Sequence, residues 1–208
     1  LWTVWNDESK ADTSRLKAMK KIAWDGYLYS QPDSAFYYAE VMYDFALKVD
    51  NKKYMSKALN TQGVSFQFQG NYEKALEIYE KSFKIFKEIG DSSGMGGVYS
   101  NIGHIYHNQG NYEKALEYFK KSLKIDEEIG NKKGIGSSYN NIGVIYRNQG
   151  NYEKALSYFL KSLKISEEIG DKRGMGGSYL NIGSIYYYQD NYEKALEYFK
   201  KSLKIDEE

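Results

Sequence analysis

The 208-residue sequence contains no cysteine and only one proline. The lack of cysteine excludes disulfides, thiolate metal sites and cysteine nucleophiles, and it leaves the redox compartment open. The scarcity of proline favours long uninterrupted helices, because a proline inside a helix costs about 3 kcal/mol. The sequence also lacks any apolar run of about 18 residues, so we expect no membrane insertion by this segment.

The chain has almost no net charge, since 29 basic and 28 acidic side chains leave a formal charge of +1. A nucleic-acid-binding domain normally carries a strongly basic patch, so nucleic acid is not an expected partner. Charges alternate along tracts such as EYFKKSLKIDEE, which indicates solvated helix faces. The chain starts at Leu1 without methionine and ends inside an expected helix, which favours a fragment of a longer protein of unassigned compartment.

One tract recurs with a period of 40 residues. The letters NYEKAL begin at residues 71, 111, 151 and 191. Self-similarity at this period predicts a stacked array of supersecondary units, each of which buries its apolar face against its neighbours. In such an array, function comes from a surface that several units build together.

Residues 131–170 show how one unit is expected to fold. Tyr139, Ile142, Gly143 and Tyr146 follow the spacing of one helix face. A second helix follows after a short turn, which predicts a hairpin of two antiparallel helices of about 18 residues each.

Small residues are expected to set the geometry of this hairpin. Gly150 suits the left-handed conformation after a helix end, and Asn151 and Asp171 are good helix caps. Gly143 and Ala155 are placed where the two helices approach closely, and a bulkier side chain there costs about 1–3 kcal/mol. The equivalent pairs in other units are Gly103 with Ala115 and Gly183 with Ala195.

The pattern Ile-Gly-x-x-Tyr, then Gly-Asn-Tyr-x-x-Ala, then a spaced aromatic and a small residue, resembles the tetratricopeptide repeat (TPR). It is carried by Ile142, Gly143, Tyr146, Gly150, Tyr152, Ala155, Phe159 and Ser162. The resemblance implies an all-α fold, a right-handed α-solenoid of antiparallel helix pairs (TPR superhelix). The 40-residue period exceeds the usual period of about 34. It is similar to the repeats of Pins-type scaffolds, kinesin light chains and TPR regions of bacterial signalling proteins.

The resemblance divides the chain into a cap segment, a degenerate first repeat and four further repeats, the last one truncated. Their expected ranges are 1–14, 15–50, 51–90, 91–130, 131–170 and 171–208. Pro32 and Gly26 depart from the pattern in the degenerate repeat. The residues expected to seal the open end of the core are Trp2, Val4, Trp5 and Trp24.

In the resembling fold, the first helix of each hairpin lines a concave groove. Polar side chains lie on the face opposite the packed one. These candidate binding residues are Asn60, Gln67, Asn101, His104, His107, Asn108, Asn140, Asn141, Arg147, Asn148, Asn181, Ser184, Tyr187 and Tyr188. Asn101, Asn141 and Asn181 recur at the 40-residue period, and in the resembling families such asparagines pair with the backbone of an extended peptide. Alternatively, they hold the repeats together or are tolerated on a wet surface.

We expect no catalytic site, cofactor or metal. His104 and His107 lie one turn apart, but no third ligand is close in sequence, and two histidines on one helix cannot build a Ser-His-Asp triad. The glycine tracts 94–97 and 174–177 do not follow strands, so a phosphate-binding loop is not expected. They form either a smooth floor for a ligand or a frayed helix start. Related repeats carry charged residues there, and their absence weighs against selectivity for acidic peptides.

These features predict a non-enzymatic scaffold that binds a protein or peptide in its groove. One alternative, from resemblance alone, is a sensory or regulatory region of a larger bacterial signalling enzyme, a nucleotide cyclase or histidine kinase. Another is a homo-oligomer formed through the uncapped final helix, where Ala195, Phe199 and Leu203 are expected to be presented without a following helix.

Overall fold

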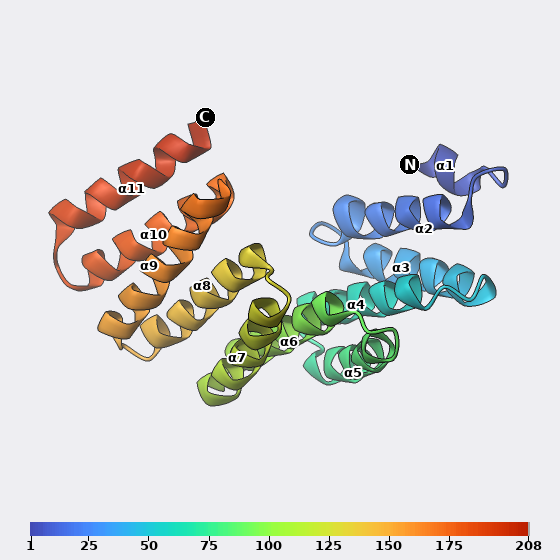
Figure 1. The fold of residues 1–208 in the computed structure, drawn as a ribbon, viewed down its shortest axis with the longest axis horizontal. Helices are drawn as coiled ribbons and strands as arrows, with labels where there is room; N and C mark the ends of the chain where they lie inside the picture. The colour runs from blue at the N-terminus through green and yellow to red at the C-terminus, as the bar shows by residue number, and fades with distance from the viewer. Residues whose placement is uncertain (208) are drawn as a thin grey trace. The chain divides into compact units, whose positions relative to one another are not determined.

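The computed structural model describes residues 1–207, which form helices joined by short turns and contain no β-strand (Figure 1). The all-α fold class is therefore confirmed. The helices are α1 Trp2–Asn6, α2 Asp12–Lys21, the π-helical segment η1 Ile22–Tyr27, α3 Pro32–Lys48, α4 Lys52–Phe68, α5 Tyr72–Glu88, α6 Ser92–Asn108, α7 Tyr112–Glu128, α8 Lys132–Asn148, α9 Tyr152–Ile169, α10 Lys172–Tyr188 and α11 Tyr192–Glu207.

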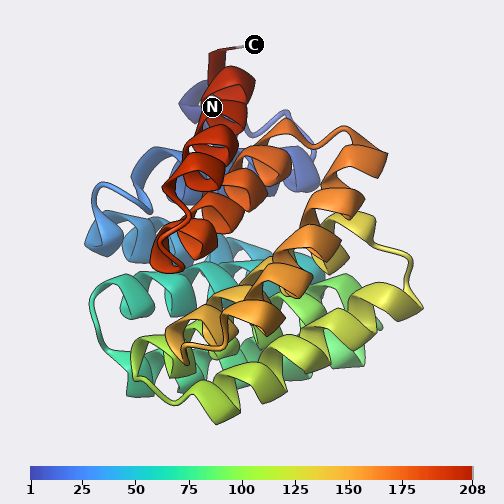
Figure 2. The same ribbon diagram turned by 90° about the vertical axis from the view of Figure 1, so that its left-hand side faces the viewer.

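The chain folds as two compact units, the first spanning Leu1–Ile105 and the second continuing from Tyr106. In the first unit, α3 packs against η1 and α4, and α4 packs against α5. In the second, contacts run in order from α7 to α11, each helix packing on the next. Figure 2 shows α10 and α11 side by side as one such pair. Each unit is thus a stack of helix pairs, as expected for a solenoid.

The turns between helices are built as the sequence predicts. Gly150 has a φ of +74°, and the N–H groups of Gly150 and Asn151 donate to the carbonyls of Arg147 and Tyr146, both at 2.9 Å. This is a Schellman ending, which satisfies carbonyls at the helix end. Asn151 Oδ1 then accepts the N–H of Lys154 at 3.1 Å and so caps α9.

A glycine facing an aromatic ring holds the two helices of a hairpin together. A Cβ on Gly143 would lie 2.6 Å from Cε1 of Phe159, and one on Gly183 would lie 2.7 Å from the ring of Phe199. The same contact joins Gly63 to Tyr79 in the first unit. The expected close approach is confirmed, and Phe159 cannot easily yield because it is fully buried.

The tryptophans that were expected to seal the N-terminal end of the core differ in how deeply they are buried. Trp5 packs on the cluster that contains Met19 and Met42, with its ring centroid 5.2 Å from that of Phe45. Trp2 remains 43% exposed, although its ring edge contacts another aromatic ring. Trp24 is half-buried and lines a pocket described below.

The first glycine of each glycine tract is explained by packing. Neither predicted explanation, a smooth floor for a ligand or a frayed helix start, is needed at that position. Gly94, Gly134 and Gly174 each begin the first helix of a hairpin, where a Cβ would collide with a side chain of the preceding helix. The side chains at this crowded position are Phe86, Asp126 and Ser166. These glycines therefore serve the packing between successive hairpins. Gly97 and Gly177 differ, because a Cβ on either would meet no atom within 4 Å.

Asp126 is the carboxylate among those three side chains, and it is only 5% exposed. Its Oδ1 accepts the Nδ2–H of Asn131 at 2.7 Å. Burial raises the pKa of Asp126 above its ordinary value, and the hydrogen bond from Asn131 opposes that rise.

Alanine substitutions at two glycines separate packing from helix propensity. Gly143→Ala and Gly177→Ala gain the same propensity, about 1 kcal/mol in a helix interior. Only Gly143→Ala collides with Phe159, so we expect it to be less stable than Gly177→Ala by about 1–3 kcal/mol. Urea unfolding of both variants measures the difference; equal stabilities would contradict the contact.

Asp126→Asn tests the cost of the buried carboxylate. Because the folded pKa is raised, stability falls as pH rises from the unfolded value, near 3.8, through the folded one. We expect Asp126→Asn to raise the Tm at pH 7, and the gain to shrink below pH 3.8. Glu128→Gln, at an exposed carboxylate of α7, is the control and should stay within about 0.5 kcal/mol. A Tm gain that does not depend on pH would refute this interpretation.

Candidate functional site

The polar candidates of the second unit gather on α8 and α10, which contact each other. Asn181 joins the two helices, because its Nδ2 donates to Asn140 Oδ1 at 2.8 Å. Its Oδ1 in turn accepts a guanidinium N–H of Arg147 at 3.0 Å. All three side chains are half-buried, so they form a fixed polar network at the surface of two successive first helices.

A second polar pair joins α8 to the end of α6. Asn148 Nδ2 is 2.8 Å from His107 Nε2. Burial lowers the pKa of His107, with a smaller contribution from Arg147, and a hydrogen bond to Asn108 opposes it. The neutral imidazole can therefore accept the amide hydrogen of Asn148 at neutral pH. Within residues 1–207, no group of three His, Cys, Asp or Glu side chains is placed to hold a metal ion.

The tyrosines near the end of α10 are more exposed than the amides. Tyr187 is 55% exposed and contacts Tyr192, with ring centroids 5.6 Å apart. Tyr188 stacks on Tyr152 at 5.6 Å with an interplanar angle of 5°. Ser184 donates to the carbonyl of Leu180 within its own helix at 2.8 Å. These side chains extend the polar network with aromatic surface.

In the first unit, the candidate residues bond within the protein. Asn101 Nδ2 donates to Asn60 Oδ1 at 3.0 Å, linking α6 to α4. Gln67 Oε1 accepts the hydroxyl of Tyr79 at 3.0 Å, which ties it to its own hairpin. His104 and Asn141 are half-buried, in the first and second unit respectively, and Asn108 is exposed.

Two of the asparagines predicted to form a ladder, Asn101 and Asn181, form hydrogen bonds with asparagines of the preceding hairpin. Asn101 bonds Asn60, and Asn181 bonds Asn140, one position before the ladder residue Asn141. The structural alternative drawn from the sequence therefore holds for Asn101 and Asn181, and their binding of a peptide stays a prediction. The amides hold neighbouring hairpins together, and they also lie at the surface.

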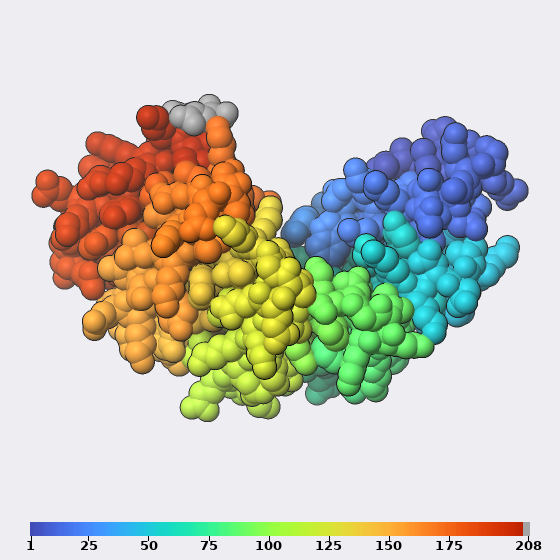
Figure 3. All heavy atoms as spheres, viewed as in Figure 1, coloured from blue at the N-terminus to red at the C-terminus, as the bar shows by residue number. Residues whose placement is uncertain are grey.

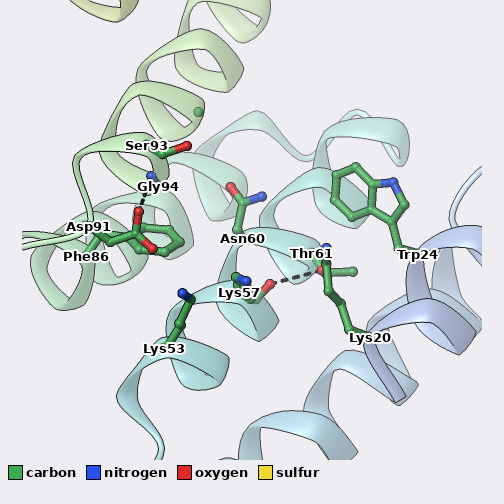
Figure 4. Close-up of a pocket in the computed structure, with 11 residues that line it drawn as sticks. Lys20, Trp24, Lys53, Lys57, Asn60, Thr61, Phe86, Asp91, Ser93 and Gly94 are labelled. Carbon is green, nitrogen blue, oxygen red and sulfur yellow. Dashed lines mark hydrogen bonds between the residues drawn. The ribbon is translucent and has the colours of Figure 1, made fainter. Parts of the chain in front are cut away.

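The first unit contains a pocket that the sequence did not indicate. Its volume is about 410 Å³ (Figure 4). Its lining residues are Lys20, Trp24, Lys53, Lys57, Asn60, Thr61, Phe86, Asp91, Ser93, Gly94 and Gly97. Only Asn60 was a candidate. Extending the 40-residue period back from Asn60 reaches Lys20, so this signal was present in the degenerate repeat.

The surface of the last helix differs from its prediction. Ala195 is only 2% exposed, and Phe199 is half-buried with its ring against Gly183. Leu203 is 59% exposed, as predicted, and Leu196, which was not predicted, is 54% exposed. Figure 3 shows α11 at the edge of its unit. None of the helices in the described part of the chain has the length and apolarity to cross a membrane.

Comparison with known proteins identifies the fold. A family model described as tetratricopeptide repeat matches residues 54–128 and 134–208, which confirms the resemblance. No curated protein sequence matched.

Three solved structures illustrate the likeness. A signal transduction ATPase (STAND) protein with a tetratricopeptide repeat sensor from Pyrococcus horikoshii has a TM-score of 0.73 at 23% identity, covering 96% of this chain and 31% of that one. Aspartyl phosphate phosphatase F from Bacillus subtilis has a TM-score of 0.70 at 19% identity, covering 95% and 61%. A putative kinesin light chain from Podosopora anserina has a TM-score of 0.68 at 14% identity, covering 94% and 96%. The chain spans less than two thirds of the first two, and identities this low establish the fold alone.

Asn181→Ala tests whether the network on α8 and α10 is structural. It removes two hydrogen bonds that water partly replaces, so we expect a loss of about 0.5–1.5 kcal/mol in the free energy of unfolding. Ser184→Ala on the same helix should change it by less than about 0.5 kcal/mol. Chemical denaturation measures both, and a neutral Asn181→Ala would show that the amide contributes nothing to stability.

Proposed function

Because this chain belongs to the tetratricopeptide repeat family, we propose that it is a non-enzymatic scaffold that binds an extended segment of another protein. The segment lies along the first helices of the hairpins, and in the second unit these are α8 and α10. A stack of helix pairs suits this role, because it presents an extended surface in place of a single cleft.

The observation that carries the proposal is the network of Asn140, Asn181 and Arg147. An asparagine amide has two N–H donors and an oxygen with two lone pairs, and an arginine has five donors. Asn181 uses one N–H on Asn140, and Arg147 uses one donor on Asn181. The groups that remain are held in position before any ligand arrives, which lowers the entropy cost of binding. These remaining donors and acceptors can form hydrogen bonds with the N–H and C=O groups of a peptide backbone.

The aromatic surface next to the network gives the segment an apolar contact. Leu180 is half exposed, and Tyr187 lies two turns beyond it on α10. Tyrosine rings provide large contact areas at low conformational cost. Backbone recognition by the amides would therefore be combined with side-chain selection by Leu180 and Tyr187.

A regulatory region within a larger signalling protein uses the same surface. The similar Pyrococcus horikoshii structure is described as carrying a tetratricopeptide repeat sensor, and this chain covers only 31% of it. In that setting, the segment bound by the repeats belongs to a domain elsewhere in the same protein or to its signalling partner. Self-association through Leu196 and Leu203 stays a separate prediction.

A bulky side chain on the proposed face tests the function. Peptides are selected from a random library displayed on phage, and their affinity is measured by fluorescence anisotropy. We expect Ser184→Trp on α10 to weaken binding by at least about tenfold, since a large ring covers the face. Ser157→Trp on the second helix α9, an exposed position, is the matched control and should stay within about twofold. Failure to select any peptide, or equal losses in both variants, would contradict the proposal.

A further inference from the structure

The pocket of the first unit brings together residues from five elements, α2, η1, α4, α5 and α6. Lys20 comes from the end of α2 and Trp24 from η1, while Lys53 and Lys57 come from the first turns of α4. The opposite wall is the last turn of α5 and the start of α6. Figure 4 shows the indole of Trp24 on one side, Asp91 and Gly94 on the other, and the lysines between them.

The charge of this pocket is strongly one-sided. Lys20, Lys53 and Lys57 line it, and Asp91 is the one acidic lining residue. Asp91 Oδ1 accepts the N–H of Gly94 at 2.9 Å, so this carboxylate is already engaged as a helix cap. Within residues 1–207, no ion pair joins any of the three lysines to a carboxylate. The lining therefore carries an excess of two positive charges.

The pKa of Lys57 reflects the close spacing of the three lysines. Burial lowers the pKa of Lys57, and the nearby charges of Lys20 and Lys53 lower it further, while Asp91 opposes them. The ammonium group lies 5.3 Å from the ring of Tyr54, its one cation–π contact in the described chain. An anion bound among these ammonium groups would relieve their repulsion.

The pocket is large enough for a small ligand and is bordered by the N-terminus of a helix. Its volume of about 410 Å³ lies within the range of roughly 300–1,000 Å³ that is typical of small-ligand sites. Gly97 leaves room at the α6 side, since a Cβ there would meet no atom within 4 Å. The N-terminus of α6, whose dipole favours negative charge, faces the same space through Ser93 and Gly94.

We propose that this pocket binds a phosphate monoester, carried on a phosphorylated side chain of the segment that the scaffold recognises. The inference deepens the proposed function and rests on it. A phosphate dianion offsets the excess of two charges, whereas a single carboxylate offsets only one. Lysines bind phosphate as point charges without fixed geometry. The Trp24 ring lies where it can cover the side chain that carries the phosphate.

The test uses small probes, so it does not require the partner. O-phospho-L-tyrosine and O-phospho-L-serine are titrated into the whole 208-residue chain by calorimetry at low salt, with L-tyrosine and L-aspartate as references. We expect at least one phosphorylated probe to bind about tenfold more tightly than either reference, and its affinity to fall as salt is raised. Circular dichroism confirms that each variant below is folded.

Two variants locate the site, and one controls for charge. Lys57→Gln and Lys20→Gln should each weaken the phosphorylated probe by about fivefold or more, because each removes a contact to the dianion. Lys81→Gln removes the same charge from an exposed position of α5 and should stay within about twofold. Trp24→Ala should weaken O-phospho-L-tyrosine more than O-phospho-L-serine if the ring covers the side chain.

Several results would overturn the inference. L-aspartate binding as tightly as both phosphorylated probes would show an unselective cationic surface, as would equal losses in Lys57→Gln and Lys81→Gln. Adenosine monophosphate binding more tightly than both phosphoamino acids would show a site for a free nucleotide. Because the probes act in the first unit and Ser184→Trp acts in the second, failure here is distinguishable from failure of segment binding.

Discussion

The contact between a glycine and an aromatic ring is the constraint on which each hairpin depends. Gly143 on α8 lies against the ring of Phe159 on α9 with no room for a Cβ, and Gly183 meets Phe199 in the same way. The contact lets the backbones approach closely and turns the opposite side of the first helix toward solvent. The polar network of Asn140, Arg147 and Asn181 occupies that solvent side. Packing on one face of a helix thus determines which residues the other face exposes to solvent.

The repeated helical backbone accommodates different side chains where successive hairpins pack together. Phe86, Asp126 and Ser166 fill one equivalent position, and a glycine of the next helix makes space for each of them. The repeated backbone therefore keeps its geometry while individual contacts vary in polarity.

The repeat period accounts for why so much of the fold was predictable. The spacing of Gly150 and Asn151 located the turn and cap, because local backbone chemistry determines both. The pocket was missed, because two of its lining residues, Lys20 and Trp24, lie in the degenerate repeat, where Gly26 and Pro32 break the pattern. The pairing of Asn181 with Asn140 was also missed. It depends on which side chains of two helices meet, and periodicity alone does not determine that.

We propose above that the solvent side of the first helices is the binding surface. The most direct measurement is the change in backbone amide chemical shifts when a library-selected peptide is titrated into the isotope-labelled protein. We expect the largest changes to cluster on α8 and α10, around Asn140, Arg147 and Ser184. Changes confined to α9 and α11, or to the exposed leucines Leu196 and Leu203, would contradict it.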